Sequence, residues 1–159
     1  MFRLGFGYDV HRLDKDRPLI LGAVRIPHSL GLLGHSDADV LIHAVIDAIL
    51  GALAKGDIGQ HFPDSDPANK GIESLKMLEK VVELMKEDSF LVNNIDSTII
   101  AEKPKLAPYV QEMRNNLARV LEISIDQVSI KATTSEGLGF CGRQEGMAAY
   151  AVASLISSS

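Results

Sequence analysis

The hydrophobic positions of the chain change their spacing along the sequence, and this spacing predicts the secondary structure. Residues 2–11, FRLGFGYDVH, are apolar and β-prone, which indicates a strand. LILGAVRIP, residues 19–27, predicts two short strands folded about its central Gly-Ala pair. Later segments predict strands because they alternate or carry small β-tolerant side chains: residues 91–102, 127–134 and 147–156.

Three segments have helical spacing instead. In the first, Ser36 or Asp37 is expected to cap a helix that runs to about Lys55 and stops at the following glycine. Residues 72–89 place their apolar side chains along one stripe, as an amphipathic helix does. Residues 107–122, which follow a proline, predict the third helix.

Two segments without periodicity, residues 57–71 and 135–146, are expected to be loops. The chain shows no internal repeat and no linker, and its strands alternate with helices. A length of 159 residues is enough to bury a core. The sequence therefore predicts the α/β (α+β) class, with one domain over residues 1–159 and a mixed β-sheet that has its helices on one face.

Composition narrows the classes of partner. Hydrophobic residues make up 46% of the chain and charged residues 23%, which is typical of a globular protein. Aromatic residues make up only 5%, so we expect an aliphatic core. The formal net charge of −5 argues against nucleic acid or an anionic membrane as a partner. A local cluster of lysine, arginine or metal can still attract an anionic substrate.

The chain has one cysteine, Cys141, so no intrachain disulfide can form and a reducing compartment is expected. We interpret it as a small packing residue in a glycine-rich loop. The longest apolar region, VLIHAVIDAILGALA, is interrupted by His43 and Asp47 and is shorter than the roughly 20 residues of a membrane span. We expect a cytoplasmic protein, or one of a plastid-type organelle if a transit peptide has been removed.

A metal site is the first candidate chemistry. Asp9 and His11 lie two positions apart in a predicted strand and therefore share one face. His43 lies on the first predicted helix, where Asp39 and Asp47 share its face at four-residue spacing. Two imidazoles and one carboxylate with a vacant position form the ligand set of catalytic zinc, and either aspartate could hold the second ring nitrogen of His43. The alternative is a strand end and a helix face that both contact water.

Two further stretches could bind ligands. GHSD, residues 34–37, precedes a helix, where backbone amides attract anions and the side chains of His35 and Ser36 could add donors. A simple capping turn is the alternative. GDIGQHFPDSDP, residues 56–67, presents aspartates that could bind the hydroxyls of a polyol or a hard cation. The alternative is an ordinary acidic surface loop.

KATTSEGLGFCGR, residues 131–143, contains the components of a phosphate site. It combines a lysine, an arginine, two threonine hydroxyls and the backbone amides of three glycines. Glu136 suits such a site if a Mg²⁺ ion lies between its carboxylate and the phosphates. The motif is not a Walker loop, because GxxxxGK[ST] does not occur in the chain. Lys103 and Lys105 add another anion contact, or they are solvated.

Taken together, these stretches closely resemble one family. DVH, HSDADVLIH, GDIGQHFPDSDP, AEKPKL and KATTSEGLGFCGR follow one another in this order, and the resemblance extends from about residue 3 to residue 156. The family is that of the 2-C-methyl-D-erythritol 2,4-cyclodiphosphate synthases of the non-mevalonate isoprenoid pathway. Each stretch thereby gains an expected role.

The resemblance implies two metals. One Zn²⁺ per subunit would be bound by the residues that match the family's ligands: Asp9, His11 and His43. Glu136 would help to hold a second cation, Mg²⁺ or Mn²⁺, on the substrate diphosphate. The residues that match those assigned to transition-state stabilisation are His35 and Thr134.

The resemblance also implies a substrate pocket in three parts. Around the metal it comprises Asp9, Val10, His11, His35 and Ser36. The methylerythritol part would contact Asp57, Ile58, Gly59, Phe62, Pro63, Asp64, Ser65 and Asp66. The cytidine and its phosphates would contact Ala101, Glu102, Lys103, Pro104, Lys105, Leu106, Ala107, Thr133, Thr134, Ser135 and Glu136, with Phe140 and Arg143 nearby.

The implied reaction is that of a phosphorus–oxygen lyase. The 2-phosphate of 4-diphosphocytidyl-2-C-methyl-D-erythritol 2-phosphate attacks the β-phosphate, which closes the cyclodiphosphate and releases CMP. The family assembles as a homotrimer with active sites between subunits. Phe6, Tyr8 and Tyr150 fall where the family varies near the trimer axis, and Ala38 replaces a common glycine at the entry to the helix.

Two other classes of function stay open from the residues themselves. A metal-dependent phosphohydrolase could use the same Asp-His-His set with water as its nucleophile, and it would release inorganic phosphate. A non-catalytic oligomeric binding protein could have kept the fold, although intact liganding residues argue against this class. Analysis of the products formed with both metals present distinguishes the three.

Overall fold

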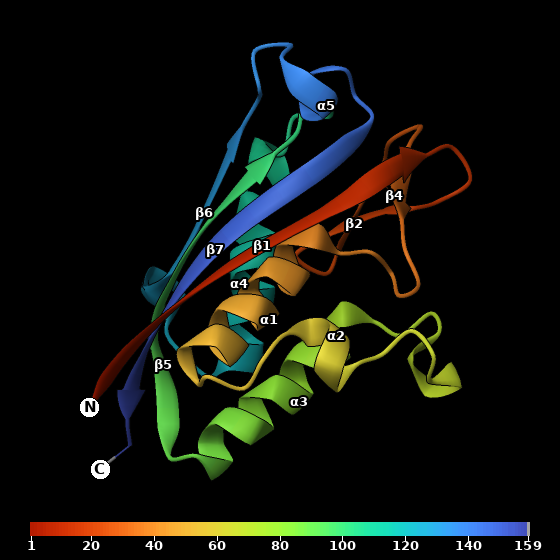
Figure 1. Ribbon diagram of the computed structural model, residues 1–159. Helices are drawn as coiled ribbons and strands as arrows, with labels where there is room; N and C mark the ends of the chain where they lie inside the picture. Colours follow the sequence, from red (N-terminus) through yellow and green to blue (C-terminus); the bar gives the residue numbers. More distant parts are fainter. Residues whose placement is uncertain (159) are drawn as a thin grey trace.

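A five-stranded mixed sheet forms the centre of the computed structural model, which describes residues 1–158 (Figure 1). Its strands, in the spatial order β4-β1-β7-β5-β6, are β1 (Phe2–Asp14), β4 (Gly31–Leu33), β5 (Phe90–Ile100), β6 (Val128–Thr133) and β7 (Gly146–Ser157). Only β5 and β6 run parallel, and the other neighbours are antiparallel. A separate hairpin pairs β2 (Leu19–Leu21) with β3 (Val24–Ile26). The mixed sheet predicted from the sequence is confirmed.

The three long helices cover one face of this sheet, as predicted (Figure 1). They are α1 (Val40–Ala52), α3 (Ser74–Glu87) and α4 (Val110–Leu121). Both segments predicted as loops contain short helical turns: α2 (Ile58–His61), α5 (Gly139–Gly142) and the 3₁₀ turn η1 (Pro67–Asn69). Two further 3₁₀ turns flank α4, η2 (Ala107–Tyr109) and η3 (Ile125–Gln127). Strand β4 was not predicted, because three residues carry too little pattern.

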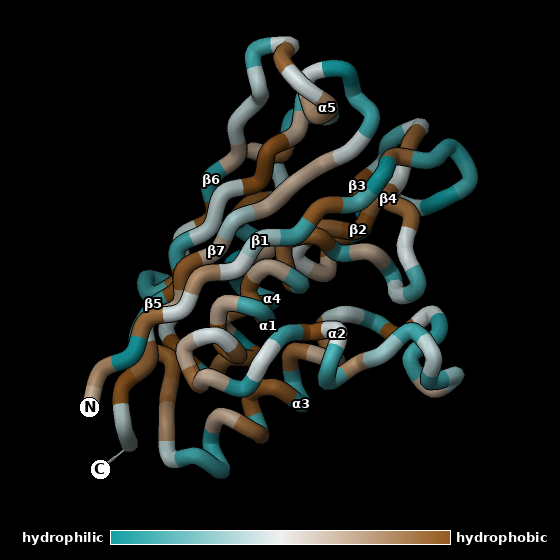
Figure 2. Tube along the Cα trace, in the orientation of Figure 1, coloured by the Kyte–Doolittle hydropathy of each residue, from teal (hydrophilic) through white to brown (hydrophobic). Residues whose placement is uncertain are grey.

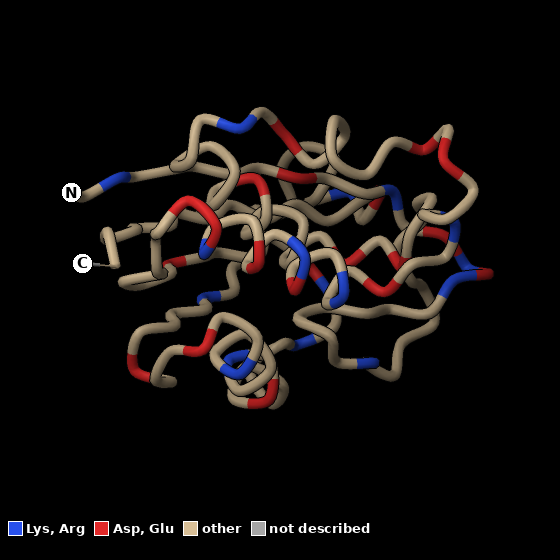
Figure 3. The backbone as a smooth tube through the Cα atoms, turned by 90° about the horizontal axis from the view of Figure 1, so that it is seen from below, with Lys and Arg blue, Asp and Glu red and all other residues tan. Residues whose placement is uncertain are grey.

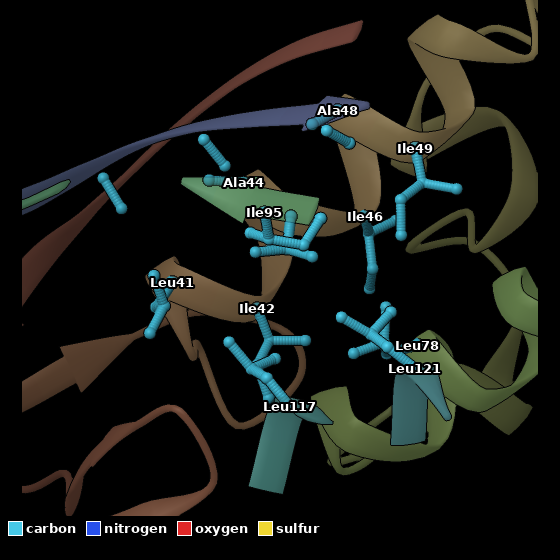
Figure 4. Close-up of a cluster of buried hydrophobic side chains, with 14 of the residues drawn as sticks. Leu41, Ile42, Ala44, Ile46, Ala48, Ile49, Leu78, Ile95, Leu117 and Leu121 are labelled. Atoms are coloured by element: carbon cyan, nitrogen blue, oxygen red, sulfur yellow. The ribbon is translucent and has the colours of Figure 1, made fainter. Parts of the chain in front are cut away.

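Helix α1 is the central element of the core. Eleven of its thirteen residues are buried, because the sheet covers one side and α3 packs against the other. Figure 4 shows Ile42 and Ile46 of α1 among Leu78, Leu117 and Ile95, which come from α3, α4 and β5. The hydropathy-coloured trace in Figure 2 places α1 and the middle of the sheet in this apolar interior. The aliphatic core expected from the composition is confirmed.

Strand β1 presents its glycines, not its large side chains, to α1. A Cβ atom at Gly5 would lie 1.8 Å from the carbonyl oxygen of Ala48, and one at Gly7 would lie 1.9 Å from that of Ala44. The helix backbone therefore packs directly on the strand, and only glycine fits at these two positions. The large apolar residues of β1 alternate with them and are exposed on the opposite face: Phe2, Leu4, Phe6, Tyr8 and Val10.

The cap of α1 is Asp39, which corrects the expected Ser36 or Asp37. Oδ1 of Asp39 accepts a hydrogen bond from the backbone N–H of Ile42 at 3.1 Å. All three candidates are good cap residues, so the sequence alone could not choose among them. The path of the chain decides, because Ala38 has a φ of 59° and delays the helix to residue 40. This positive φ also explains why glycine is common there.

Asp39 also connects the β2–β3 hairpin to α1 through hydrogen bonds. Its carboxylate is fully buried and accepts backbone N–H groups from Gly22 at 3.0 Å and Ala23 at 2.7 Å. Replacing Asp39 by Ala leaves buried donors without partners, so we expect the free energy of unfolding to fall by about 1–3 kcal/mol. Urea unfolding of the wild type and the variant measures this change. The control Asp16→Ala removes an exposed carboxylate, and an equal loss in both variants would contradict the prediction.

No helix within residues 1–158 combines the length and the apolar character that crossing a bilayer requires. Figure 3 shows basic and acidic residues interspersed along the chain.

Candidate metal centre and active site

The structure brings Asp9, His11 and His43 together, as the sequence predicted. Oδ2 of Asp9 lies 2.9 Å from Nε2 of His11 and 3.0 Å from Nδ1 of His43. The two ring nitrogens are 3.1 Å apart. Asp9 and His11 continue the inner face of β1, and His43 faces them from α1 because the glycines of β1 admit the helix so closely. Among residues 1–158 these three form the one such cluster able to hold a metal ion.

The second nitrogen of each ring is held by a neighbour. Nδ1 of His11 lies 3.0 Å from the carbonyl oxygen of Leu33, which can only accept, so Nδ1 carries the proton. Nε2 of His43 lies 2.7 Å from Oγ of Ser74 and 3.2 Å from Oγ of Ser36. These contacts leave Nε2 of His11 and Nδ1 of His43 as lone pairs that face Asp9.

Neither Asp39 nor Asp47 holds the ring of His43, which corrects that expectation. Asp39 is the helix cap, and Asp47 accepts a hydrogen bond from the backbone N–H of Ile58 at 2.7 Å. Helical spacing places all three side chains along one stripe, but the direction that each takes depends on its neighbours from other elements. His43 is oriented instead by Ser74, a residue 31 positions away that no sequence pattern indicated.

Charge in the cluster favours a bound cation. Burial raises the pKa of Asp9, but hydrogen bonds from His11 and His43 outweigh burial and bring this pKa to about 2. Burial lowers the pKa of His11, whereas the hydrogen bond and the negative charge of Asp9 raise it above its usual value. When each ring is neutral and carries its proton on the outer nitrogen, the carboxylate and two ring lone pairs converge within 3.1 Å and repel one another unless a positive charge, either a proton or a metal ion, lies among them. The residues therefore fit a metal ion with three protein ligands and an open position.

The three residues of the cluster line a cleft of about 310 Å³. Predicted site residues that line this cleft, besides the three ligands, are His35, Ser36, Ile58, Gly59, Phe62 and Asp64. Nε2 of His35 is buried there without a hydrogen-bond partner among the described residues. The lining residues that the sequence did not indicate are Gly34, Asn69, Ile72 and Met77. Ile72 and Met77 are apolar residues just before α3 and within it. From the sequence alone, such residues are expected to pack in the hydrophobic core.

Only some of the substrate-binding residues predicted in the acidic loop after α1 line this cleft. Asp57 caps α2 through the N–H of Gln60, and Asp66 caps η1 through the N–H of Ala68. Four predicted residues of this loop are exposed and do not line the cleft: Asp57, Pro63, Ser65 and Asp66. Asp64 is therefore the one loop carboxylate that faces the cleft.

A second pocket, of about 270 Å³, gathers part of the set expected to receive the nucleotide; the predicted residues that do not line it are Lys103, Ser135, Glu136, Phe140 and Arg143. It is lined by Ala101, Glu102, Pro104, Lys105, Leu106, Ala107, Ala132, Thr133 and Thr134. The peptide bond between Lys103 and Pro104 is cis, and Lys103 is exposed beside the pocket. The two pockets share no lining residue. One chain therefore presents the two expected halves of the site separately.

Glu136 is exposed on a loop that Glu102 organises. Oε1 of Glu102 accepts the backbone N–H groups of Ser135 at 2.8 Å and Gly137 at 3.4 Å, one on each side of Glu136. Oγ1 of Thr134 accepts the N–H of Glu136 at 3.2 Å, and Glu136 itself has a φ of 53°. Glu136 is not part of the Asp9 cluster.

The cationic residues of the glycine-rich segment have acidic partners. Lys131 lies 3.0 Å from Asp96, and Arg143 lies 2.9 Å from Glu145. Glu145 also lines a further pocket, together with Val10, His11, Arg12, Phe140 and Gly146. The side chain of Val10 is on the face of β1 opposite to Asp9. Cys141 is buried, and burial raises the pKa of its thiol, as expected for a packing residue.

Comparison with known proteins identifies the family. The profile of the YgbB family matches residues 2–156. The 2-C-methyl-D-erythritol 2,4-cyclodiphosphate synthase of Agathobacter rectalis is 60% identical over 153 residues, which cover 96% of this chain and 86% of that protein. The chain belongs to the YgbB family. The predicted enzyme class, a 2-C-methyl-D-erythritol 2,4-cyclodiphosphate synthase, is thereby confirmed.

Solved structures agree with this assignment. The bifunctional IspDF of Campylobacter jejuni superimposes with a TM-score of 0.95 at 41% identity, covering 99% of this chain. This chain covers 42% of that longer protein. IspF of Plasmodium falciparum, in complex with CDP, superimposes with a TM-score of 0.87 at 33% identity, over 99% of this chain and 97% of that one. The fold of this chain is thus that of the synthases.

Proposed function

We propose that the chain cyclises 4-diphosphocytidyl-2-C-methyl-D-erythritol 2-phosphate by an intramolecular phosphoryl transfer, templated by metal ions, in a homotrimer. The observation that carries this proposal is the convergence of Asp9, His11 and His43 in the wall of a 310 Å³ cleft. Three protein ligands with an open position are the arrangement of catalytic zinc. A metal ion held in this way could bind a phosphate of the substrate at its open position and polarise it.

Asp9, His11 and His43 would hold Zn²⁺, which when bound supplies a Lewis acid and a template for the β-phosphate. His35 and Thr134 would stabilise the charge that develops on the phosphoryl group. The buried Nε2 of His35, which has no partner among the described residues, is suited to contact an incoming phosphate oxygen. Ser36 lines the same cleft and would donate its hydroxyl proton to the substrate.

The chain has no need of its own nucleophile. An oxygen of the 2-phosphate forms the new bond to the β-phosphorus, and the bond from that phosphorus to the CMP oxygen breaks, with CMP keeping the electron pair. The cleft would hold the methylerythritol portion against Ile58, Phe62 and Asp64 so that the two phosphates meet. Orientation of this kind can contribute roughly 7–11 kcal/mol, and phosphoryl transfer depends mainly on positioning and charge neutralisation.

The second pocket would receive the cytidine and the phosphates attached to it. Its wall combines Lys105 with the threonines at the end of β6, and Lys103 lies beside it. The Plasmodium falciparum relative, with this fold, is solved with CDP bound. We assign the segments 101–107 and 133–136 to nucleotide binding on these two grounds.

Assembly into a homotrimer would complete the site. The outer face of the sheet carries a continuous set of exposed apolar residues: Phe2, Leu4, Phe6, Tyr8, Val10, Leu91, Tyr150, Val152 and Ile156. A soluble monomer rarely exposes so large an apolar patch. A second copy of the chain is the occupant we propose, because the metal cleft and the nucleotide pocket do not join within one chain. Contact between copies would place one pocket against the cleft of a neighbour.

A CMP-release assay combined with zinc quantification tests the proposal. With substrate and both metals present, we expect CMP and a cyclic diphosphate, and zinc at one ion per chain. Release of inorganic phosphate would identify a phosphohydrolase instead. No turnover, with the substrate still bound, would identify a binding protein.

Glu136 is the residue we assign to the second cation. Glu136→Gln removes the negative charge that Mg²⁺ or Mn²⁺ requires, so we expect a higher metal concentration for half-maximal CMP release and unchanged zinc content. Titration of the zinc-loaded enzyme with Mg²⁺ measures this shift. The control Glu112→Gln makes the same substitution at an exposed glutamate on helix α4. An activation curve for Glu136→Gln that coincides with the control would refute the assignment.

A further inference from the structure

Behind His43, the buried Ser74 is held in turn by the partly buried Asp37, which has no role in the site described so far. Ser74, the first residue of α3, has no exposed surface, and its Oγ lies 2.7 Å from Nε2 of His43. The same hydroxyl donates to Oδ1 of Asp37, and the backbone N–H of Ser74 donates to Oδ2 of Asp37 at 2.9 Å. Asp37 also accepts the N–H of Asp39 at 3.2 Å.

The directions of these hydrogen bonds assign the proton on the His43 ring. A carboxylate only accepts, so the proton of the Ser74 hydroxyl points to Asp37. The oxygen of Ser74 must then accept from His43, and Nε2 carries the ring proton. Nδ1 is left as a lone pair directed at Asp9 and His11.

We propose that Asp37 and Ser74 are positioning residues that fix the tautomer and the orientation of His43, and so set the affinity of the metal centre. The inference rests on the metal site proposed above. Partners that hold the second nitrogen of a metal-binding histidine orient its ring and raise its basicity. The negative charge of Asp37 acts on His43 through the hydroxyl of Ser74.

The pair has a second consequence for the cleft. Nε2 of His43 has one proton, and Ser74 receives it at the shorter distance, so Ser36 at 3.2 Å does not need to accept it. Oγ of Ser36 accepts the N–H of Ala38 at 3.1 Å, and its own proton stays free for a ligand in the cleft. Ser74 thus leaves Ser36 available as a donor.

Backbone contacts tie the same two segments together. The carbonyl of His35 accepts the N–H of Gly71 at 2.9 Å, and the N–H of Asp37 donates to the carbonyl of Ile72 at 3.1 Å. With the bonds between Asp37 and Ser74, these contacts join the segment before α1 to the start of α3. The orientation of His43 is therefore fixed by two elements besides its own helix.

Zinc affinity and the histidine tautomer test this inference independently of turnover. Ser74→Ala and Asp37→Asn are expected to weaken zinc binding by about 10–100-fold, measured by competition with a chromogenic chelator. Ser74→Thr keeps the hydroxyl and is expected to retain most of the affinity. Long-range ¹H–¹⁵N correlation on the zinc-loaded protein should show His43 protonated at Nε2 in the wild type and in Ser74→Thr.

The matched control is Ser97→Ala. Ser97 is also buried, but its hydroxyl donates to the carbonyl of Ser129 in β6, away from the metal centre. An unchanged zinc dissociation constant in Ser74→Ala, or an equal change in Ser97→Ala, would overturn the inference. Should Ser74→Ala fail to fold, Asp37→Asn decides by the same two measurements.

The outcome distinguishes this inference from the proposed function. A wild-type chain that binds no zinc would refute the metal site, and the positioning role with it. A wild-type chain that binds zinc and releases CMP, with Ser74→Ala and Asp37→Asn equal to it in zinc affinity, would refute only the role of the pair.

Discussion

Replacing Asp9 by Ala is expected to abolish zinc binding and to lower the rate of CMP release by roughly 10³-fold, while the fold survives. The carboxylate lies within 3.0 Å of both ring nitrogens, and it is the one negative charge of the cluster. A bound metal supplies several kcal/mol to such a transition state, and each 1.36 kcal/mol is a factor of ten in rate. His43→Ala is expected to give the same result. Metal analysis and the CMP assay measure both variants.

The control for this experiment is His28→Ala. His28 is a partly exposed histidine in the connection between β3 and β4, outside the cleft. We expect its zinc content and turnover to match those of the wild type. Full zinc occupancy in Asp9→Ala and His43→Ala would exclude the proposed ligand set, whatever the effect on rate.

Phe6→Asp is expected to convert the assembly into monomers and to remove most of the activity. Phe6 is 61% exposed in the single chain and packs its ring against Tyr150, with the ring centroids 5.9 Å apart. An unpaired carboxylate buried between copies costs several kcal/mol, and each 1.4 kcal/mol is a factor of ten in association. We expect the association constant to fall at least about 100-fold. Light scattering after size-exclusion chromatography measures the mass.

Gln111→Asp provides a matched change of charge on the helical side. It replaces an exposed neutral residue of α4 by the same carboxylate. We expect this variant to remain a trimer with wild-type activity. If Phe6→Asp keeps the mass of the wild type, the outer face of the sheet is not the contact between copies. If it is monomeric but fully active, the site does not depend on a second copy.

The core of the metal site could be predicted from the sequence, because short-range geometry places most of it. Asp9 and His11 share a face in any extended strand, and His43 lies on a strongly periodic helix. The family resemblance supplied the step that spacing could not, namely that this strand and this helix meet. The structure confirms that the strand and the helix are in contact, because α1 packs closely on Gly5 and Gly7.

The partners behind the ligands could not be predicted. Asp39 and Asp47 share the helix face of His43, yet one caps α1 and the other binds the backbone of α2. The hydroxyl that contacts His43 comes from Ser74, at the start of a different helix. Helical spacing fixes which residues share a stripe, but the neighbours of that stripe come from distant parts of the chain.

The sequence by itself determined the class of fold, the order of the long elements and the identity of the candidate ligands, because these follow from local periodicity and from motifs. Only the tertiary structure decided which face of β1 is buried. Its alternation of large apolar residues with glycine suggests that the large residues pack inside. The helix takes the glycine face instead, because only there can its backbone approach the strand, and the apolar side chains remain exposed on the outer face. Burial depends on which surface a partner covers, and local sequence does not specify that partner.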